Sequence, residues 1–162
     1  MVSVNKPPDR AQLYELLSVV VDPEIPVLTL EDLGVLRDIS VTGNEINVTI
    51  TPTYAGCPAL ETMRDDIITT LKKAGYPQVT VKQSLSPAWS TDWMSDIGRQ
   101  KLRAYGIAPP ARATCEMQTG TIECPQCGSG SIKLISEFGS TACKALYQCQ
   151  ECREPFDYFK CI

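Results

Sequence analysis

Cys57 is the residue whose type and surroundings most favour chemistry in this sequence. It lies in the turn Thr51–Pro58, between an alternating apolar run that ends at Ile50 and a helical pattern that starts near Pro58. Because proline suits the first position of a helix, we expect Cys57 at or beside the N-cap. The free amides and dipole of a helix N-terminus stabilise an anion, which predicts a thiol pKa lowered from roughly 8.5 toward about 7–8. The alternative is a small buried hydrophobe, a common role for a lone cysteine.

Four other cysteines form two C-x-x-C pairs, a spacing that is typical of a metal site. The chain has eight cysteines and no histidine, so metal ligands must come from sulfur or oxygen. Four thiolates in a tetrahedron suit structural zinc, and iron fits the same spacing. Since a module of about 40 residues cannot bury enough core, we expect the metal to supply most of its folding energy. The predicted ligands are Cys124, Cys127, Cys149 and Cys152.

Two carboxylates, Asp22 and Glu24, lie in a stretch that the prolines at 23 and 26 make rigid and extended. Taken locally, this stretch indicates a capped turn with solvated charges. If the stretch lies near Cys57, it would offer hard oxygen ligands beside a soft sulfur, a combination that suits iron.

Periodicity indicates the elements that position these residues. Asp9 and Gln12 form a capping box ahead of an apolar stripe that ends before Pro23. Two alternating strands, at about 35–41 and 45–51, flank a turn at 42–45. A helix from Pro58 to Gly75 and a strand near 79–85 complete a parallel crossover. The predicted fold class is α+β: a small mixed sheet of about three strands with packed helices, plus a C-terminal zinc ribbon.

We expect three parts in the chain: a first domain over 1–106, a linker over 107–121, and the four-cysteine ribbon over 122–162. Thr91 or Asp92 is expected to cap a helix running to about Tyr105. Trp89 and Trp93 are expected either to pack in the core, or to cover the cysteine turn or anchor a partner.

Composition narrows the classes of function. The chain has 162 residues and a net charge of −4, which disfavours nucleic-acid binding and a transcription-type zinc ribbon. No apolar run approaches the roughly 20 residues of a membrane span, and the first residues lack the core of a signal peptide. We therefore expect a cytoplasmic protein. Without histidine no Ser–His or Cys–His nucleophile pair can form, which disfavours an enzyme and leaves a thiol activated by the helix terminus as an alternative.

Several segments together resemble known families. Residues 22–26, 32–34 and 51–58 resemble the metal–sulfur cluster biosynthesis domain shared with SufT-like proteins, over about the first 105 residues. Residues 86–94, 136–147 and 152–162 are similar to PaaD proteins, the D components encoded with the phenylacetyl-CoA epoxidase of aerobic phenylacetate degradation. The resemblance then covers nearly the whole chain.

The resemblance implies a role beside the epoxidase and not as its catalytic subunit. Its partners would be a di-iron oxygenase and a reductase that carries a flavin and an iron–sulfur cluster. By resemblance, Cys57 is the family's reactive cysteine, and Asp22 and Glu24 are its acidic motif. We expect a maturation factor in which Cys57 transiently carries iron or an iron–sulfur cluster. One thiolate is a poor site for a whole cluster, so Cys143, a carboxylate or a second chain in a homodimer would complete the shell.

A second interpretation remains open. The chain could instead be a structural or electron-transfer component of the epoxidase, in which case it would co-purify with the oxygenase at fixed stoichiometry.

Overall fold

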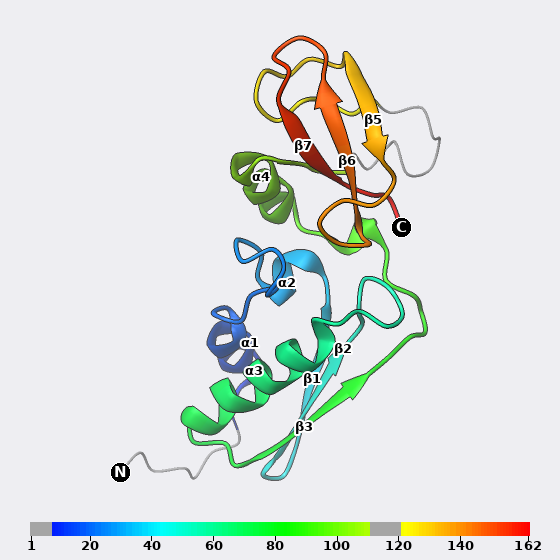
Figure 1. Cartoon of the computed structure of the whole chain (residues 1–162). Helices are drawn as coiled ribbons and strands as arrows, with labels where there is room; N and C mark the ends of the chain where they lie inside the picture. Colours follow the sequence, from blue (N-terminus) through cyan, green and yellow to red (C-terminus); the bar gives the residue numbers. More distant parts are fainter. Residues whose placement is uncertain (1–7, 111–120) are drawn as a thin grey trace. The chain divides into compact units, whose positions relative to one another are not determined.

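The chain folds into two compact units, Met1–Ala88 and Trp89–Ile162 (Figure 1). The computed structural model describes residues 8–110 and 121–162. The first unit contains α1 (Arg10–Leu17), α2 (Leu30–Leu33), β1 (Leu36–Thr42), β2 (Glu45–Ile50), α3 (Leu60–Lys73) and β3 (Gln78–Gln83). The second contains a 3-10 turn (Thr91–Trp93), α4 (Asp96–Tyr105), β4 (Ile107–Ala108), β5 (Ile132–Ser136), β6 (Lys144–Cys149) and β7 (Pro155–Phe159). The predicted α+β class is confirmed.

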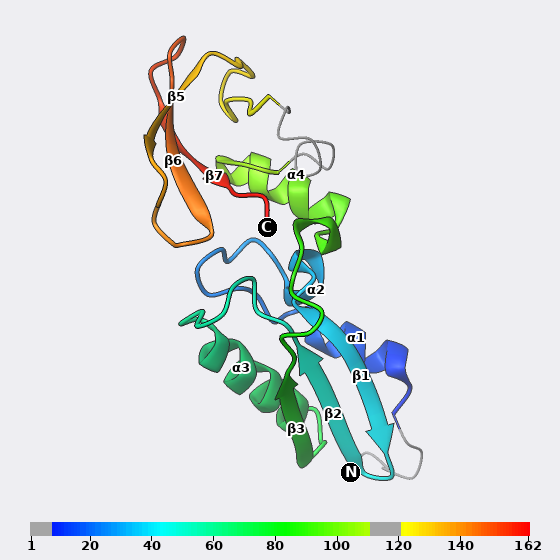
Figure 2. The ribbon, with the colours of Figure 1, turned by 90° about the vertical axis from the view of Figure 1, so that its right-hand side faces the viewer.

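The sheet of the first unit has the order β1-β2-β3. β1 and β2 form the predicted antiparallel hairpin, in which Thr42 pairs with Glu45 and Gly43 has a positive φ of 61°. β2 and β3 are parallel, as expected for strands joined by a crossover helix. Both α1 and α3 cover one face of the sheet (Figure 2), and that face carries the predicted alternation of buried side chains. On β2 these are Ile46, Val48 and Ile50.

Helix α1 begins as its sequence predicts and ends earlier. The Asp9 side chain accepts from the amide of Ala11, and the Gln12 side chain accepts from the amide of Asp9, so the capping box is present. The helix ends at Leu17 because both the amide and the hydroxyl of Ser18 bond the carbonyl of Glu15, at 3.2 and 2.7 Å. Val20 is nevertheless buried, from a turn that follows the helix.

The sheet of the second unit has the order β4-β7-β6-β5 and includes a strand from upstream of the cysteine pairs. β4 pairs in parallel with β7, and Trp89 packs against Phe159 with ring centroids 5.9 Å apart. Arg99 donates to the carbonyls of Thr91 and Pro110. These contacts attach the segment from Trp89 onward to the ribbon.

The boundary between the two compact units therefore lies after Ala88. From the sequence we expected the first domain to end at residue 106. The expected linker begins with Ile107–Ala108, which form β4, and residues 111–120 of it lie outside the described ranges. The helix cap also differs, since α4 is capped by the Ser95 hydroxyl, 2.9 Å from the amide of Gly98, and not by Thr91 or Asp92. Where an independently folding piece ends stays a prediction.

Among residues 8–110 and 121–162, no helix has the length and apolar character needed to cross a membrane.

Candidate functional site

Asp22 is a buried carboxylate that organises the acidic loop. It is 5% exposed, and its Oδ1 accepts hydrogen bonds from the amides of Glu24 at 2.7 Å and Ile25 at 2.9 Å. The loop closes through the amide of Asp22, which bonds the carbonyl of Leu28. The sequence correctly suggested a capped turn here, but the charge of Asp22 is shielded from solvent. Glu24 remains half-buried.

Cys57 lies in a tight turn after β2, as expected, but it does not lie at the N-cap of the helix that follows. The N-cap of α3 is Ala59, which has helical backbone angles, and the first helical residue is Leu60. The prediction that Pro58 opens the helix with Cys57 at the cap is therefore wrong by about two residues. Gly56 has a positive φ of 81°, so the turn favours glycine before the cysteine. The carbonyl of Cys57 accepts from the amide of Leu60, which ties the turn to the helix.

The pKa of Cys57 is raised, whereas the sequence led us to expect a lowered value. Burial is the largest cause, since the residue is only 8% exposed. The negative charges of Glu24 and Asp22 raise the pKa of Cys57 further. The amide of Ala59 and the hydroxyl of Tyr54 lower it by hydrogen bonding to the sulfur, but they do not offset burial and the carboxylates. The structure thus brings Cys57 within electrostatic reach of both predicted carboxylates.

Tyr54 is a site residue that the sequence did not single out. Its side chain bonds the sulfur of Cys57, and its carbonyl accepts from the amide of Cys57 at 3.3 Å. The only available signal was its position three residues before the cysteine in a turn. Thr51 and Thr53, in the same segment, are also buried.

The four cysteines of the second unit converge as predicted. The four Sγ atoms lie within 4.8 Å of one another, and those of Cys124 and Cys152 are 3.7 Å apart, as Cys127 and Cys149 are at 3.5 Å. Four thiolates at about 2.3 Å from a tetrahedral zinc lie about 3.8 Å from one another. The spacing therefore fits a four-coordinate metal with no open position, which is a structural and not a catalytic arrangement.

Both cysteine pairs form the same kind of turn. In the first, the amide of Cys124 bonds the carbonyl of Ser129, five residues on, at 2.9 Å. In the second, the amide of Cys149 bonds the carbonyl of Glu154 at 3.0 Å. The residue after the second cysteine has a positive φ in both turns: 76° at Gly128 and 66° at Arg153. Arg153 is the only non-glycine residue with positive φ in the described ranges, so the second turn holds a conformation that most side chains avoid.

The remaining residues of interest lie in the second unit. Cys143 is buried beside the hydroxyl of Thr141, with 3.0 Å between the sulfur and the oxygen, and Cys161 is disulfide-bonded. Trp89 is a core residue of this unit, 3% exposed, and Trp93 is half-buried. Cys115 lies outside the described residues.

Comparison with known proteins matches a different family to each end of the chain. Residues 10–82 match the family of iron-sulfur cluster assembly proteins, and residues 108–160 match the PaaD zinc beta ribbon domain. An Escherichia coli K12 protein, provisionally named as the D component of 1,2-phenylacetyl-CoA epoxidase, is 50% identical over 157 residues, which cover 96% of this chain and 95% of that protein. The chain belongs to the PaaD family.

Two solved structures are similar to the first part of this PaaD-family chain. A DUF59 domain of unknown function from Bacillus anthracis matches with a TM-score of 0.54 and 27% identity, over 57% of this chain and 90% of that one. A conserved hypothetical protein from Thermotoga maritima matches with a TM-score of 0.52 and 27% identity, over 61% of this chain and 98% of that one. This PaaD-family chain thus joins an iron–sulfur assembly domain to a zinc ribbon.

Proposed function

We propose that this protein is a maturation factor for the phenylacetyl-CoA epoxidase system, which transiently binds iron or an iron–sulfur cluster at Cys57 and passes it to a partner subunit. The observation that carries the proposal is that the negative charges of Glu24 and Asp22 act on the Cys57 thiol and raise its pKa. The match of residues 10–82 to iron-sulfur cluster assembly proteins supports the type of cargo. The relative named as an epoxidase component supports the type of recipient.

The electrostatics of the site suit a cargo that is a cation. Before loading, the site holds two negative charges and a thiol that burial keeps protonated. An incoming iron ion offsets the carboxylates, and the thiol releases one proton as the iron–sulfur bond forms. Loading is thereby coupled to proton release. A protonated thiol is also a poor nucleophile, so the free site is protected from oxidation and alkylation.

The same geometry favours transient binding. Asp22 already uses Oδ1 to hold its own turn, so its capacity to bind a cation is reduced. Glu24 is the more accessible carboxylate of the two. One sulfur and one or two oxygens leave the coordination shell of iron incomplete, and we propose that a second copy of the chain or the recipient supplies the rest. A partial shell releases its cargo when the recipient offers more ligands.

We propose that the ribbon holds structural zinc. Its four ligands leave no open position, and a closed site of this kind contributes folding energy without taking part in transfer.

Loading can be tested without any partner. Protein prepared without oxygen is supplied with ferrous iron and sulfide, and its iron, sulfide, zinc and absorption spectrum are compared with those of Cys57→Ser. The proposal predicts iron bound by the wild type and absent from the variant, with the zinc content unchanged. Equal iron in both proteins would contradict a role for Cys57 in loading.

A second candidate function follows from the naming of the relative as part of the epoxidase itself. A structural or electron-transfer component would remain bound to the oxygenase at a fixed ratio through purification. A maturation factor would dissociate after loading, so gel filtration of the co-expressed system separates the two functions.

A further inference from the structure

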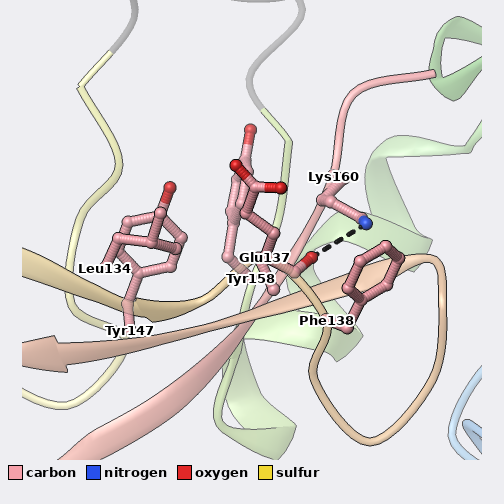
Figure 3. A pocket seen from close by; sticks show the side chains of 7 residues that line it. Leu134, Glu137, Phe138, Tyr147, Tyr158 and Lys160 are labelled. Atoms are coloured by element: carbon pink, nitrogen blue, oxygen red, sulfur yellow. Dashed lines mark hydrogen bonds between the residues drawn. The ribbon is translucent and has the colours of Figure 1, made fainter.

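A hollow on the ribbon sheet is used by neither the metal cluster nor the Cys57 site (Figure 3). It has a volume of about 290 Å³. All of its lining residues except Leu134 lie in two C-terminal segments, residues 136–147 and 152–162. The lining residues are Leu134, Glu137, Phe138, Ala145, Tyr147, Tyr158 and Lys160.

The floor of the hollow is fixed by the sheet and the metal core beneath it. Ala145 on β6 pairs with Tyr158 on β7, and its small side chain leaves the space open. The Tyr147 ring packs edge-on against Tyr158, at 5.8 Å, and stacks on Phe156, at 6.1 Å. Phe156 belongs to the buried cluster that contains the metal-ligating cysteines 124 and 149. The metal core therefore supports the aromatic floor directly.

The rim of the hollow is the loop between β5 and β6, which hydrogen bonds to residues of β6 and β7 hold in place. The amide of Gly139 bonds the carbonyl of Lys144 at 2.7 Å, and the Ser140 hydroxyl bonds Asp157 at 3.1 Å. A Cβ at position 139 would lie 2.5 Å from Oδ1 of Asp157, so a larger residue there would displace the carboxylate that holds Ser140. The loop thus presents Phe138 at the edge of the hollow in a defined place, and the space is formed before any occupant arrives.

The rim also carries charge. The ammonium of Lys160 lies 4.6 Å from the centre of the Phe138 ring and donates to the carbonyl of Glu137 at 3.0 Å. An ammonium has three N–H donors, so it can bind a carboxylate as well. Glu137 also lines the hollow, and in Figure 3 its carboxylate points away from the Lys160 nitrogen.

The volume of the hollow and the exposure of its lining residues indicate which kind of group it can bind. Sites for cofactors and drug-sized ligands span about 300–1,000 Å³, so this volume lies at the lower end of that range and suits a small group such as one large side chain. Two of its apolar lining residues remain exposed: Leu134 at 43% and Phe138 at 65%. A small aromatic pocket inside an exposed apolar rim is the usual form of an anchor site for a protein partner.

We propose that this hollow is the docking site for a partner subunit of the epoxidase, which inserts one aromatic or large aliphatic side chain and places a neighbouring carboxylate on Lys160. The identity of the partner rests on the proposed function, whereas the pocket, its rim and its charge come from the ribbon itself. In this arrangement the ribbon selects the recipient and the first unit carries the cargo.

The test measures binding of the zinc-loaded full chain to each purified epoxidase subunit by calorimetry. Ala145→Leu fills the pocket from its floor, Phe138→Ser removes its wall in an exposed loop, and Lys160→Met removes its charge. The matched control is Ile97→Ser, which changes an apolar side chain that is 60% exposed on α4 and does not line the hollow. Zinc content and melting temperature establish that each variant is folded.

We expect one subunit to bind the wild type, and Ala145→Leu and Phe138→Ser to weaken that affinity at least about tenfold, the loss typical of a truncated anchor contact. Lys160→Met should flatten the salt dependence of the dissociation constant. Ile97→Ser should bind like the wild type. Binding is measured on protein that carries zinc and no iron, so a loss of affinity reports a failure of docking and not of metal transfer. Unchanged affinity in both pocket variants overturns the proposal. So does a pocket that binds free phenylacetate while the affinity for every subunit is unaffected by Ala145→Leu.

Discussion

Glu24 and Cys57 come from separate loops of the first unit, and the carboxylate of Glu24 lies within electrostatic reach of the Cys57 thiol. This pairing opposes ionisation of the thiol while it attracts a cation. The negative charge of Glu24 therefore disfavours a free thiolate at Cys57, in keeping with the proposal that Cys57 binds a metal cation.

The first prediction concerns pH. Because burial and the two carboxylates raise the pKa of Cys57, the thiol stays protonated at neutral pH. It gains reactivity only when the pH rises above the pKa of an ordinary cysteine. Alkylation of Cys57 by iodoacetamide, followed by peptide mass spectrometry, should be slower at pH 7 than that of an unfolded cysteine peptide. The difference should narrow as the pH increases. Faster alkylation than the peptide at pH 7 would contradict this account and support the lowered pKa expected from sequence.

The second prediction separates charge from burial. Glu24→Gln keeps the shape of the side chain and removes its charge, so the pKa of Cys57 should fall and alkylation at pH 7 should accelerate. Glu15→Gln, a change on α1, is the control and should leave the rate unaltered. The same Glu24 variant should bind iron more weakly, because it loses both a ligand and a charge. An unchanged pH profile would mean that Glu24 does not act on the thiol.

The third prediction concerns the ribbon. Replacing Cys124, a buried ligand at 0% exposure, with Ala should release the metal and unfold the ribbon over 122–162, since about 40 residues cannot bury enough core without a metal. The segment from Trp89 onward, which packs on β7, should then unfold with it. Limited proteolysis should then degrade the region after residue 88 while the first unit resists. Cys143→Ala, at a buried cysteine that is not one of the four ligands, should keep the metal. Zinc retained at one per chain by Cys124→Ala would refute the ligand assignment.

The fourth prediction concerns the extent of the first unit. A fragment of residues 1–88 has both helices that cover the sheet and all three strands, so it should be soluble and melt cooperatively. Extending it to residue 106 adds Trp89 and α4 without the ribbon partners that bury them, which should lower solubility. A fragment 1–106 that is more stable than 1–88 would instead support the boundary expected from sequence.

The features that sequence predicted well are local. The capping box of Asp9 and Gln12, the hairpin at Gly43 and the alternation on β2 each depend on residues a few positions apart. The four ribbon cysteines were also predictable, because two C-x-x-C turns have few other uses in a chain without histidine.

The features that sequence missed depend on contacts between distant residues. The pKa of Cys57 has the opposite sign because its burial and the approach of Glu24 are tertiary effects, which the local helix signal does not contain. Trp89 follows the third strand closely in sequence, yet its partner is Phe159 near the C-terminus. The N-cap of α3 is Ala59 and not Cys57, because proline at position 58 fits a turn as well as the start of a helix.

The most direct test of the central claim is the iron content of the epoxidase subunits. The components are co-expressed with wild-type protein, with Cys57→Ser, or with neither, and iron is measured in each purified partner together with oxidation of phenylacetyl-CoA. The account predicts that Cys57→Ser folds normally and keeps its zinc, while iron in the recipient and turnover fall to the level seen without this protein. Equal iron and equal turnover with the wild type and Cys57→Ser would contradict it.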